Sequence, residues 1–363
     1  MCSTFARLLG DLMYTNKTTK RINVGNVPIG GGARVSIQSM LAVPAHDIEG
    51  NVSAAKELEQ EGCEILRVAV PDKDAVKTLQ KLKENISIPV VADIHFDWRL
   101  AVLSAKAGAD KIRINPGNIG DESGVREVVR ACKERNIPIR IGVNSGSLEK
   151  SILARYGSVT ADAMVESGLY HIKMLEKYDF DDIVLSLKSS DVKIMYDAYI
   201  KAAECIKYPL HLGVTEAGTT NTGVIKSAAG IGGLLLRSIG DTIRISLTDD
   251  PKEEVRAAKR LLSALGMRRD GIRFISCPTC GRTEIDLIGI ANKVQKRLEG
   301  VKKDLTVAVM GCVVNGPGEA TAADIGIAGG KGYGVLFKKG GIINAKIPED
   351  KLVDVLISEI EKM

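Results

Sequence analysis

The chain has 363 residues, of which 45% are hydrophobic and 26% are charged, a composition typical of a globular protein and not of a disordered chain. The length allows about two domains. The net charge is only +5, the basic residues alternate with acidic ones, and aromatic residues make up only 4%. Because nucleic-acid surfaces gather basic and aromatic residues, this composition disfavours one, whereas an anionic small molecule remains a suitable ligand.

The cysteines and the hydropathy predict a cytoplasmic protein with no membrane partner. An odd number of cysteines, seven, argues against a complete disulfide framework. The N-terminal segment lacks the pattern of a signal peptide, since its apolar run is short and Asp11 interrupts it. A membrane span needs about 18 apolar residues. The longest apolar stretch, between Lys226 and Arg237, is too short for that.

Short β-branched runs alternate with helical patterns through most of the chain. Between the runs, apolar residues recur at spacings of three and four, as in Asn51–Gln60 and Ser123–Arg135. Apolar strands separated by helices predict a parallel sheet that is covered on its outside, and eight such units close naturally into a barrel. The predicted strands are Val35–Met40, Ile65–Val70, Val90–Ile94, Lys111–Ile114, Pro138–Val143, Asp182–Leu187, Leu210–Thr215 and Thr242–Leu247.

The last helix of this region has clear boundary signals. Asp250 is a suitable N-cap, Pro251 fits the first turn, Glu253 lies where a capping box has its carboxylate, and Gly266 is suited to end the helix. The rival fold is an open doubly wound sheet, which is less favoured because no G-x-G-x-x-G motif opens the first helix. The sequence therefore predicts an α/β protein with a (β/α)₈ TIM barrel over residues 1–267.

Polar and charged side chains stand at the carboxyl end of nearly every predicted strand, which is where barrel enzymes have their active sites. The plainer interpretation is that these polar residues only begin solvent-exposed loops. Polar residues at the ends of all eight strands in register favour a functional site instead. Five cations would converge there and repel one another unless an anion, most suitably a diphosphate or bisphosphate, lay among them. Pairing of single arginines with Asp93 or Glu216 is the alternative. The five cations are Arg67, Arg113, Arg140, Lys188 and Arg244.

The pattern changes after about Arg269, and residues 268–363 are predicted to form a small α+β domain. Its strands are shorter and less regularly separated by helices than those of the barrel. The predicted elements are strand Ile272–Ser276, helix Thr283–Glu299, strands Leu305–Met310, Ile325–Ala328 and Val335–Phe337, and a terminal helix from Pro348.

Three cysteines of this second region follow predicted strands: Cys277 and Cys280 form a C-x-x-C pair, and Cys312 lies in a glycine-rich turn. A C-x-x-C pair alone fits a redox dithiol, half a zinc site or part of an iron–sulfur site. All four histidines lie in the barrel half, so the best fourth ligand nearby is Glu319. Three thiolates and a displaceable carboxylate favour a [4Fe–4S] cluster with one distinctive iron over a closed zinc site. The cysteines expected to be buried fillers are Cys63, Cys132 and Cys205.

Several motifs, spread from about Arg21 to the C-terminus, are similar to those of a known enzyme family. They are Val24–Gly31, Ser36–Met40, Arg113–Asn118, Gly142–Leu148, Cys277–Arg282 and Asn315–Glu319. Together they resemble the bacterial 4-hydroxy-3-methylbut-2-enyl diphosphate synthases, and the two cysteine-bearing regions make the resemblance specific. One stretch departs from the family pattern: Leu41–His46 replaces a loop rich in threonine and asparagine, which leaves the role of the first loop open.

The resemblance implies reductive ring opening and dehydration of 2-C-methyl-D-erythritol 2,4-cyclodiphosphate to (E)-4-hydroxy-3-methylbut-2-enyl diphosphate. Electrons would come from flavodoxin or ferredoxin through a [4Fe–4S] cluster. It also implies a homodimer in which the cluster domain of one subunit covers the barrel of the other. The implied cluster ligands are Cys277, Cys280, Cys312 and Glu319. The implied substrate contacts are Arg67, Arg113, Arg140, Asn144, Lys188, Thr215, Arg244 and Ser246, with Glu216 and Glu319 as catalytic groups.

Two rival functions fit the residues without the resemblance. One is a non-redox barrel lyase or transferase, in which Lys188 would form a Schiff base and the cysteines would hold structural zinc. The other is a cluster-bearing sensor that binds a phosphorylated ligand without converting it. Cluster content separates the first rival from the synthase, and turnover separates the second.

Overall fold

The computed structural model describes residues 19–115, 118–119, 122–269, 271–313, 318 and 320–363. The chain divides into two compact units, Met1–Met267 and Arg268–Met363. Each unit has its own hydrophobic core, so each is described by itself.

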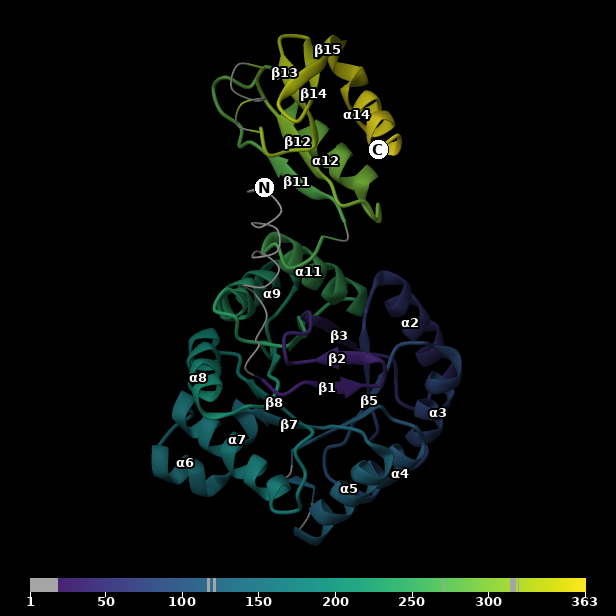
Figure 1. The fold of residues 1–363 in the computed structure, drawn as a ribbon, viewed down its shortest axis with the longest axis vertical. Helices are drawn as coiled ribbons and strands as arrows, with labels where there is room; N and C mark the ends of the chain where they lie inside the picture. The colour runs from purple at the N-terminus through teal and green to yellow at the C-terminus, as the bar shows by residue number, and fades with distance from the viewer. Residues whose placement is uncertain (1–18, 116–117, 120–121, 270, 314–317, 319) are drawn as a thin grey trace. The chain divides into compact units, whose positions relative to one another are not determined.

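The first unit is a closed parallel barrel (Figure 1). Its strands neighbour one another in the order β8-β7-β6-β5-β4-β3-β10-β9, and a parallel bridge between Leu185 and Leu210 joins the two ends of this row. All of these neighbours run parallel, which confirms the predicted fold class. The strands are β3 Ser36–Met40, β4 Ile65–Ala69, β5 Val90–Asp93, β6 Lys111–Ile114, β7 Ile139–Asn144, β8 Ile183–Lys188, β9 His211–Leu212 and β10 Thr242–Ile243.

Helices surround this barrel and pack on the outward-facing residues of the strands. Outward side chains such as Ile37, Leu66 and Ile112 share one large apolar core with the helices, which removes them from water and stabilises the barrel. The helices are α2 Ile48–Glu61, α3 Ala75–Asn85, α4 Trp98–Lys106, α5 Glu122–Arg135, α6 Lys150–Tyr156, α7 Ala161–Glu176, α8 Val192–Cys205, α9 Thr220–Ser227, α10 Gly233–Leu235 and α11 Pro251–Ala264.

The cysteines of this unit differ in their burial. Cys63 and Cys132 are buried in the core, as predicted. The prediction was wrong for Cys205, which is exposed. Cys205 is the last residue of α8, and the buried face of that helix ends at Ala202.

An antiparallel hairpin that the sequence pattern did not predict precedes the barrel. Strands β1 (Ile22–Val24) and β2 (Val27–Ile29) pair with each other and not with the barrel. The hairpin packs against inward-facing residues near the amino ends of three barrel strands. The two groups form one apolar layer, made of Ile22, Val24, Ile29, Ile65, Val91 and Val184. This layer closes the barrel lumen at its amino end.

The start of α11 agrees only partly with its predicted signals. The Asp250 side chain accepts a hydrogen bond from the Lys252 backbone N–H at 2.9 Å, and Pro251 is the first helical residue, as predicted. The capping-box role of Glu253 was wrong, because its carboxylate instead accepts from Arg256 Nη1 at 2.5 Å. The Asp250 backbone N–H donates to the Asp249 carboxylate at 2.8 Å, which takes the place expected for Glu253.

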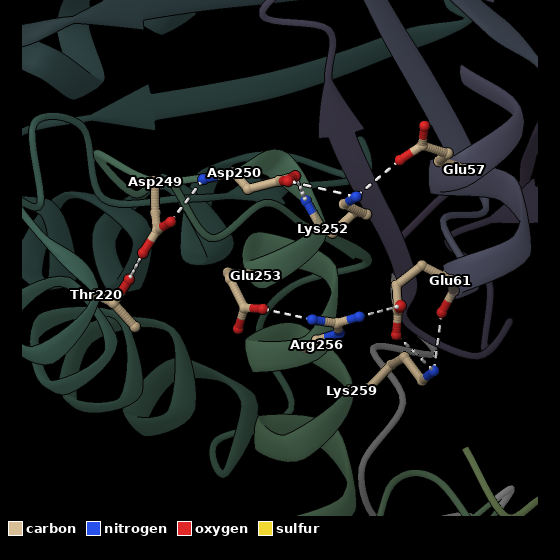
Figure 2. A network of polar contacts seen from close by, with 9 residues as sticks. All are labelled: Glu57, Glu61, Thr220, Asp249, Asp250, Lys252, Glu253, Arg256 and Lys259. Carbon is tan, nitrogen blue, oxygen red and sulfur yellow. Dashed lines mark hydrogen bonds and ion pairs between the residues drawn. The ribbon is translucent and has the colours of Figure 1, made fainter. Parts of the chain in front are cut away.

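Ion pairs join α11, the last helix of the barrel, to α2, the first (Figure 2). Lys252 Nζ lies 2.7 Å from Glu57 Oε2, and Arg256 Nη2 lies 3.0 Å from Glu61 Oε2. Lys259 Nζ donates to the Glu61 backbone carbonyl at 2.8 Å. These contacts link the first and last helices of the barrel, next to the pairing of its first strand, β3, with its last, β10.

The second unit is a five-stranded mixed sheet in the order β11-β12-β13-β14-β15. Helices α12 (Leu287–Leu298) and α14 (Leu352–Glu361) share an apolar core with one face of it. The edge strand β15, which the sequence pattern did not predict, is exposed along most of its length. The first three strands are parallel and the last two are antiparallel to their neighbours. The strands are β11 Arg273–Ser276, β12 Thr306–Met310, β13 Ile325–Gly330, β14 Tyr333–Lys338 and β15 Gly341–Pro348.

Within the described ranges, none of the helices combines the length and the apolar character that crossing a bilayer requires.

Candidate active site

Asp93, the last residue of β5, organises one side of the barrel lumen. It accepts hydrogen bonds from Arg67 Nη2 of β4 at 2.6 Å and from Arg113 Nη1 of β6 at 3.2 Å. His95 Nε2 lies 3.1 Å from the same carboxylate. Although burial opposes its ionisation, these three neighbours hold the pKa of Asp93 well below its usual range. Two of the predicted cations are therefore fixed in place by one buried carboxylate, which is the alternative pairing considered from the sequence.

Arg244 also has a carboxylate partner, and this partner comes from a helix. The guanidinium donates to Glu254 of α11 through Nη2 at 3.0 Å and through Nε at 3.1 Å. Glu254 is buried and also accepts from Ser39 Oγ at 3.1 Å. The sequence did not predict Glu254 as a site residue, because a carboxylate in the first turn of a helix gives no sign that it reaches the end of a strand.

Arg140 and Lys188 differ from the other three cations. No ion pair is found for either of them in the described part of the chain, and Arg140 Nε and Nη1 are buried without a hydrogen-bond partner there. Burial first, and then the charges of Arg140 and Arg244, hold the pKa of Lys188 well below its usual range. The lumen therefore carries more positive charge than its described carboxylates balance, and it is suited to bind an anion.

Two glycines lack the side chain that would otherwise overlap two of these cations. A Cβ atom at Gly142 would lie 2.4 Å from Arg113 Nε, and one at Gly213 would lie 2.8 Å from Lys188 Nζ. A side chain at either position would therefore displace a cation. Gly142 stands in a motif that the sequence singles out, but its steric role depends on which cation crosses it and was not predictable.

A polar pocket of about 570 Å³ opens at the carboxyl ends of β7, β8 and β9. It brings together three predicted site residues: Asn144, which ends β7, and Thr215 and Glu216, which follow β9. Glu216 has a φ of 52°, in the left-handed region that residues with a side chain adopt uncommonly. Hydroxyl and amide groups dominate the lining, which suits a ligand rich in hydroxyl groups. The remaining lining residues are Ser145, Gly146, Ser147, Val159, Ser189, Ser190, Asp191 and Ile194.

Three other parts of the prediction are less complete. Ser246 is half-buried, two residues beyond Arg244 in the chain. The motif Arg113–Asn118 is described only in part, because residues 116–117 lie outside the described residues. His46, in the divergent loop, is exposed and lies 3.1 Å from Asp72, so it does not join the cations.

The three thiols of the second unit follow its parallel strands. Ser276 of β11 pairs with Val309 of β12, so Cys277 and Cys312 follow neighbouring carboxyl ends of one sheet. The Gly311 backbone N–H donates to Cys277 Sγ at 3.1 Å, and hydrogen bonds from Arg282 lower the pKa of Cys280. All three cysteines are free.

Soft sulfur donors that receive N–H hydrogen bonds fit an iron–sulfur cluster. Among the described residues, these thiols do not form a group of three that could hold a metal ion. The fourth predicted ligand, Glu319, lies outside those residues.

Fold and site together define a two-part protein, a TIM barrel with cationic residues in its lumen and an α+β domain that carries free thiols. The chain belongs to the GcpE family. The model of the GcpE TIM-barrel domain matches residues 19–259, and that of the GcpE protein C-terminal domain matches residues 273–362.

Curated relatives that match nearly the whole chain have the name 4-hydroxy-3-methylbut-2-en-1-yl diphosphate synthase (flavodoxin). The protein of that name from Caldanaerobacter subterraneus is 57% identical over 97% of this chain and 99% of its own length. The one from Clostridium perfringens is 58% identical over 95% of this chain and 99% of its own length. Among solved structures, 3-dehydroquinate dehydratase from Geobacillus kaustophilus has a TM-score of 0.51 at 15% identity and covers 69% of this chain and 98% of its own. That likeness shows the barrel fold alone.

Proposed function

We propose that this protein is a 4-hydroxy-3-methylbut-2-enyl diphosphate synthase, which reductively opens and dehydrates 2-C-methyl-D-erythritol 2,4-cyclodiphosphate. The observation that carries this proposal is the 57% identity to a synthase over 97% of the chain, which spans both the cationic barrel and the thiol-bearing unit. The excess of buried positive charge in the barrel supports the same substrate class, since a cyclic diphosphate is a compact anion.

In the proposed complex the five cations bind the ligand in two different ways. Asp93 and Glu254 hold Arg67, Arg113 and Arg244 in fixed positions, so their guanidinium groups are preorganised for phosphate oxygens. Arg140 and Lys188, which lack a described carboxylate partner, would be neutralised by the ligand itself. The binding energy then orients the carbon–oxygen bond that breaks.

The polar pocket at the ends of β7, β8 and β9 suits the carbon skeleton of the substrate. Asn144 and Thr215 would orient its hydroxyl groups, with Ser246 as a further contact. The Glu216 carboxylate would hold or transfer the proton that dehydration requires, as a general acid or base.

The second unit would hold a [4Fe–4S] cluster through Cys277, Cys280 and Cys312, with Glu319 as a displaceable fourth ligand. When bound, the cluster supplies the electrons and a Lewis-acidic iron. The lowered pKa of Cys280 and the N–H group aimed at Cys277 favour thiolates there, as cluster binding requires.

The arrangement of the whole enzyme follows from this division. Residues 1–267 would bind the substrate and residues 268–363 the cluster. We propose a cytoplasmic homodimer in which the cluster domain of one subunit covers the barrel of the other. The printed name of the relatives supports flavodoxin as the electron donor, with ferredoxin as the alternative.

Anaerobic purification followed by a turnover assay tests the proposed function. The protein should be brown, give an iron–sulfur signal in electron paramagnetic resonance after reduction, and convert the cyclodiphosphate when a strong reductant is present. Colourless, zinc-loaded protein without turnover would instead indicate a non-redox barrel enzyme. A cluster that responds to the cyclodiphosphate without product formation would indicate a sensor.

A further inference from the structure

Lys111 is a buried lysine of the barrel that the proposed function does not use. It is the first residue of β6, two positions before Arg113, and its relative exposure is 0%. Because side chains alternate along a strand, Lys111 faces the lumen as Arg113 does, whereas Ile112 and Ile114 belong to the outer core. Lys111 Nζ has no hydrogen-bond partner among the described residues.

The surroundings of Lys111 contain more positive than negative charge. Lys111 pairs in register with Val91, which belongs to the apolar layer at the amino end. Asp93 is the carboxylate that the neighbouring strand β5 offers, and Arg67, His95 and Arg113 already occupy it. The charged or titratable groups of the lumen around Lys111 are Arg67 on β4, Asp93 on β5, Arg113 on β6, Arg140 on β7, Lys188 on β8, His211 on β9 and Arg244 on β10.

An ammonium group is costly in this position. A buried charge without a partner loses its hydration and gains nothing in return. Burial, followed by the charges of Arg140 and Arg67, lowers the pKa of Lys111 well below its usual range. Arginine does not lose its proton in proteins, whereas a buried lysine can. The net charge of the lumen can therefore change through protonation of a lysine.

We propose that Lys111 is the inner positioning residue of the anion site, neutral in the empty barrel and protonated when a diphosphate is bound among the cations. One proton passes from solvent to the lone pair of Lys111 Nζ, and no bond of the ligand changes. The field of the dianion stabilises the ammonium group, which in turn adds one positive charge beneath the ligand. This inference rests on the proposed diphosphate substrate.

Isothermal titration calorimetry tests the proton uptake. The full-length, anaerobically purified protein is titrated with the cyclodiphosphate, without reductant, in buffers of different ionisation enthalpy. Each phosphorus of this ligand carries one strongly acidic hydroxyl, so the ligand itself does not titrate near neutral pH. The wild type should take up about one proton per ligand, and its affinity should fall about tenfold per pH unit across the responsive range. Lys111→Met should show no uptake and an affinity independent of pH.

Three further variants identify the group that takes up the proton. Lys193→Met, at a lysine whose side chain is 82% exposed, should leave uptake and affinity unchanged. His211, whose two ring nitrogens are buried and unpartnered among the described residues, and Lys188, whose pKa is also lowered by burial, are the competing acceptors. Uptake that persists in Lys111→Met but disappears in His211→Asn or in Lys188→Met would overturn the proposal.

Stability separates a positioning role from a structural one. Lys111→Met should melt at the same temperature as the empty wild type or higher, because methionine fills the space without burying an amine. A lower melting temperature together with unchanged proton uptake would show that Lys111 only fills the core. If Lys111→Met does not fold, Lys111→Gln serves for the same titration.

Turnover distinguishes this inference from the proposed function. Wild-type protein that binds the cyclodiphosphate with proton uptake but never converts it would refute the synthase and leave the role of Lys111 standing. Wild-type turnover with unaltered uptake in Lys111→Met would refute the role of Lys111 alone.

Discussion

Single residues decide the chemistry of both units, and the cysteines offer the simplest test. Cys312→Ser should abolish cluster assembly and turnover while the barrel stays folded, because an alcohol is a poor ligand for iron in place of a thiolate. Iron content, circular dichroism and the turnover assay measure these effects. Cys205→Ser is the matched control, since Cys205 is also free but exposed in the barrel unit. Normal turnover in Cys312→Ser would refute the ligand assignment.

Asp241 gives the barrel a pH dependence that does not involve the site. Burial raises its pKa to about 6, although it accepts hydrogen bonds from Thr19 Oγ1 at 2.9 Å and from the Leu210 N–H at 2.8 Å. The folded state therefore holds this proton more tightly than the unfolded state does. The stabilisation is complete below about pH 4 and is lost as the pH rises through about 6, a change of about 3 kcal/mol.

Asp241→Asn should remove this pH dependence, because an amide does not titrate over the same range. Melting temperatures of the wild type and the variant, measured from about pH 4 to about pH 7, should differ by an amount that varies with pH below about 6. If the melting temperatures of the two proteins changed with pH in the same way, Asp241 would not be the group responsible for the pH dependence.

At the scale of elements, the cap of α11 should contribute more stability than the ion pairs that join α11 to α2. Asp250→Ala removes the acceptor for the Lys252 backbone N–H and should destabilise the barrel by about 1 kcal/mol. Lys252→Met breaks the pair with Glu57 but should cost less than about 0.5 kcal/mol, since both side chains are substantially exposed. Urea unfolding compares the two variants, and equal losses would show that the contacts of Figure 2 contribute more than exposed pairs usually do.

The structure also shows which elements the sequence pattern predicts well. The eight barrel strands are recognised because apolar runs alternate with helices, although β9 and β10 are strands of only two residues each. The hairpin β1–β2 has strands of three residues each and no helix between them, so this alternation does not reveal it. Strand β15 alternates poorly because it is an edge strand and only Ile347 is buried.

For the whole molecule, a complementation experiment tests the proposed arrangement of the dimer. Lys188→Met disables the barrel and Cys312→Ser disables the cluster unit, so each homodimer should be inactive. If the cluster domain of one subunit serves the barrel of the other, each mixed dimer has one intact pair. Random mixing of equal amounts should then restore roughly a quarter of wild-type turnover.

The mixed dimers also distinguish the opposite arrangement. If each subunit used its own cluster, no mixed dimer would contain an intact pair, and mixing would restore nothing. Mass spectrometry of the intact assembly confirms that mixed dimers formed, so that an inactive mixture is informative.

The sequence by itself determined the barrel and the chemical types of the site residues. Strand and helix periods are local, and the polar residues that end the strands are visible without coordinates. These signals were enough to select the cations, the C-x-x-C pair and Cys312.

Only the tertiary structure decided which of these charged groups are paired with a group of opposite charge. Arg244 is paired with Glu254, which lies ten residues away on a helix, whereas Arg67 and Arg113 share Asp93. The isolation of Lys111 was equally invisible in the sequence. Electrostatic balance depends on distances and burial across strands that are far apart in the chain, and only the closed barrel sets those distances.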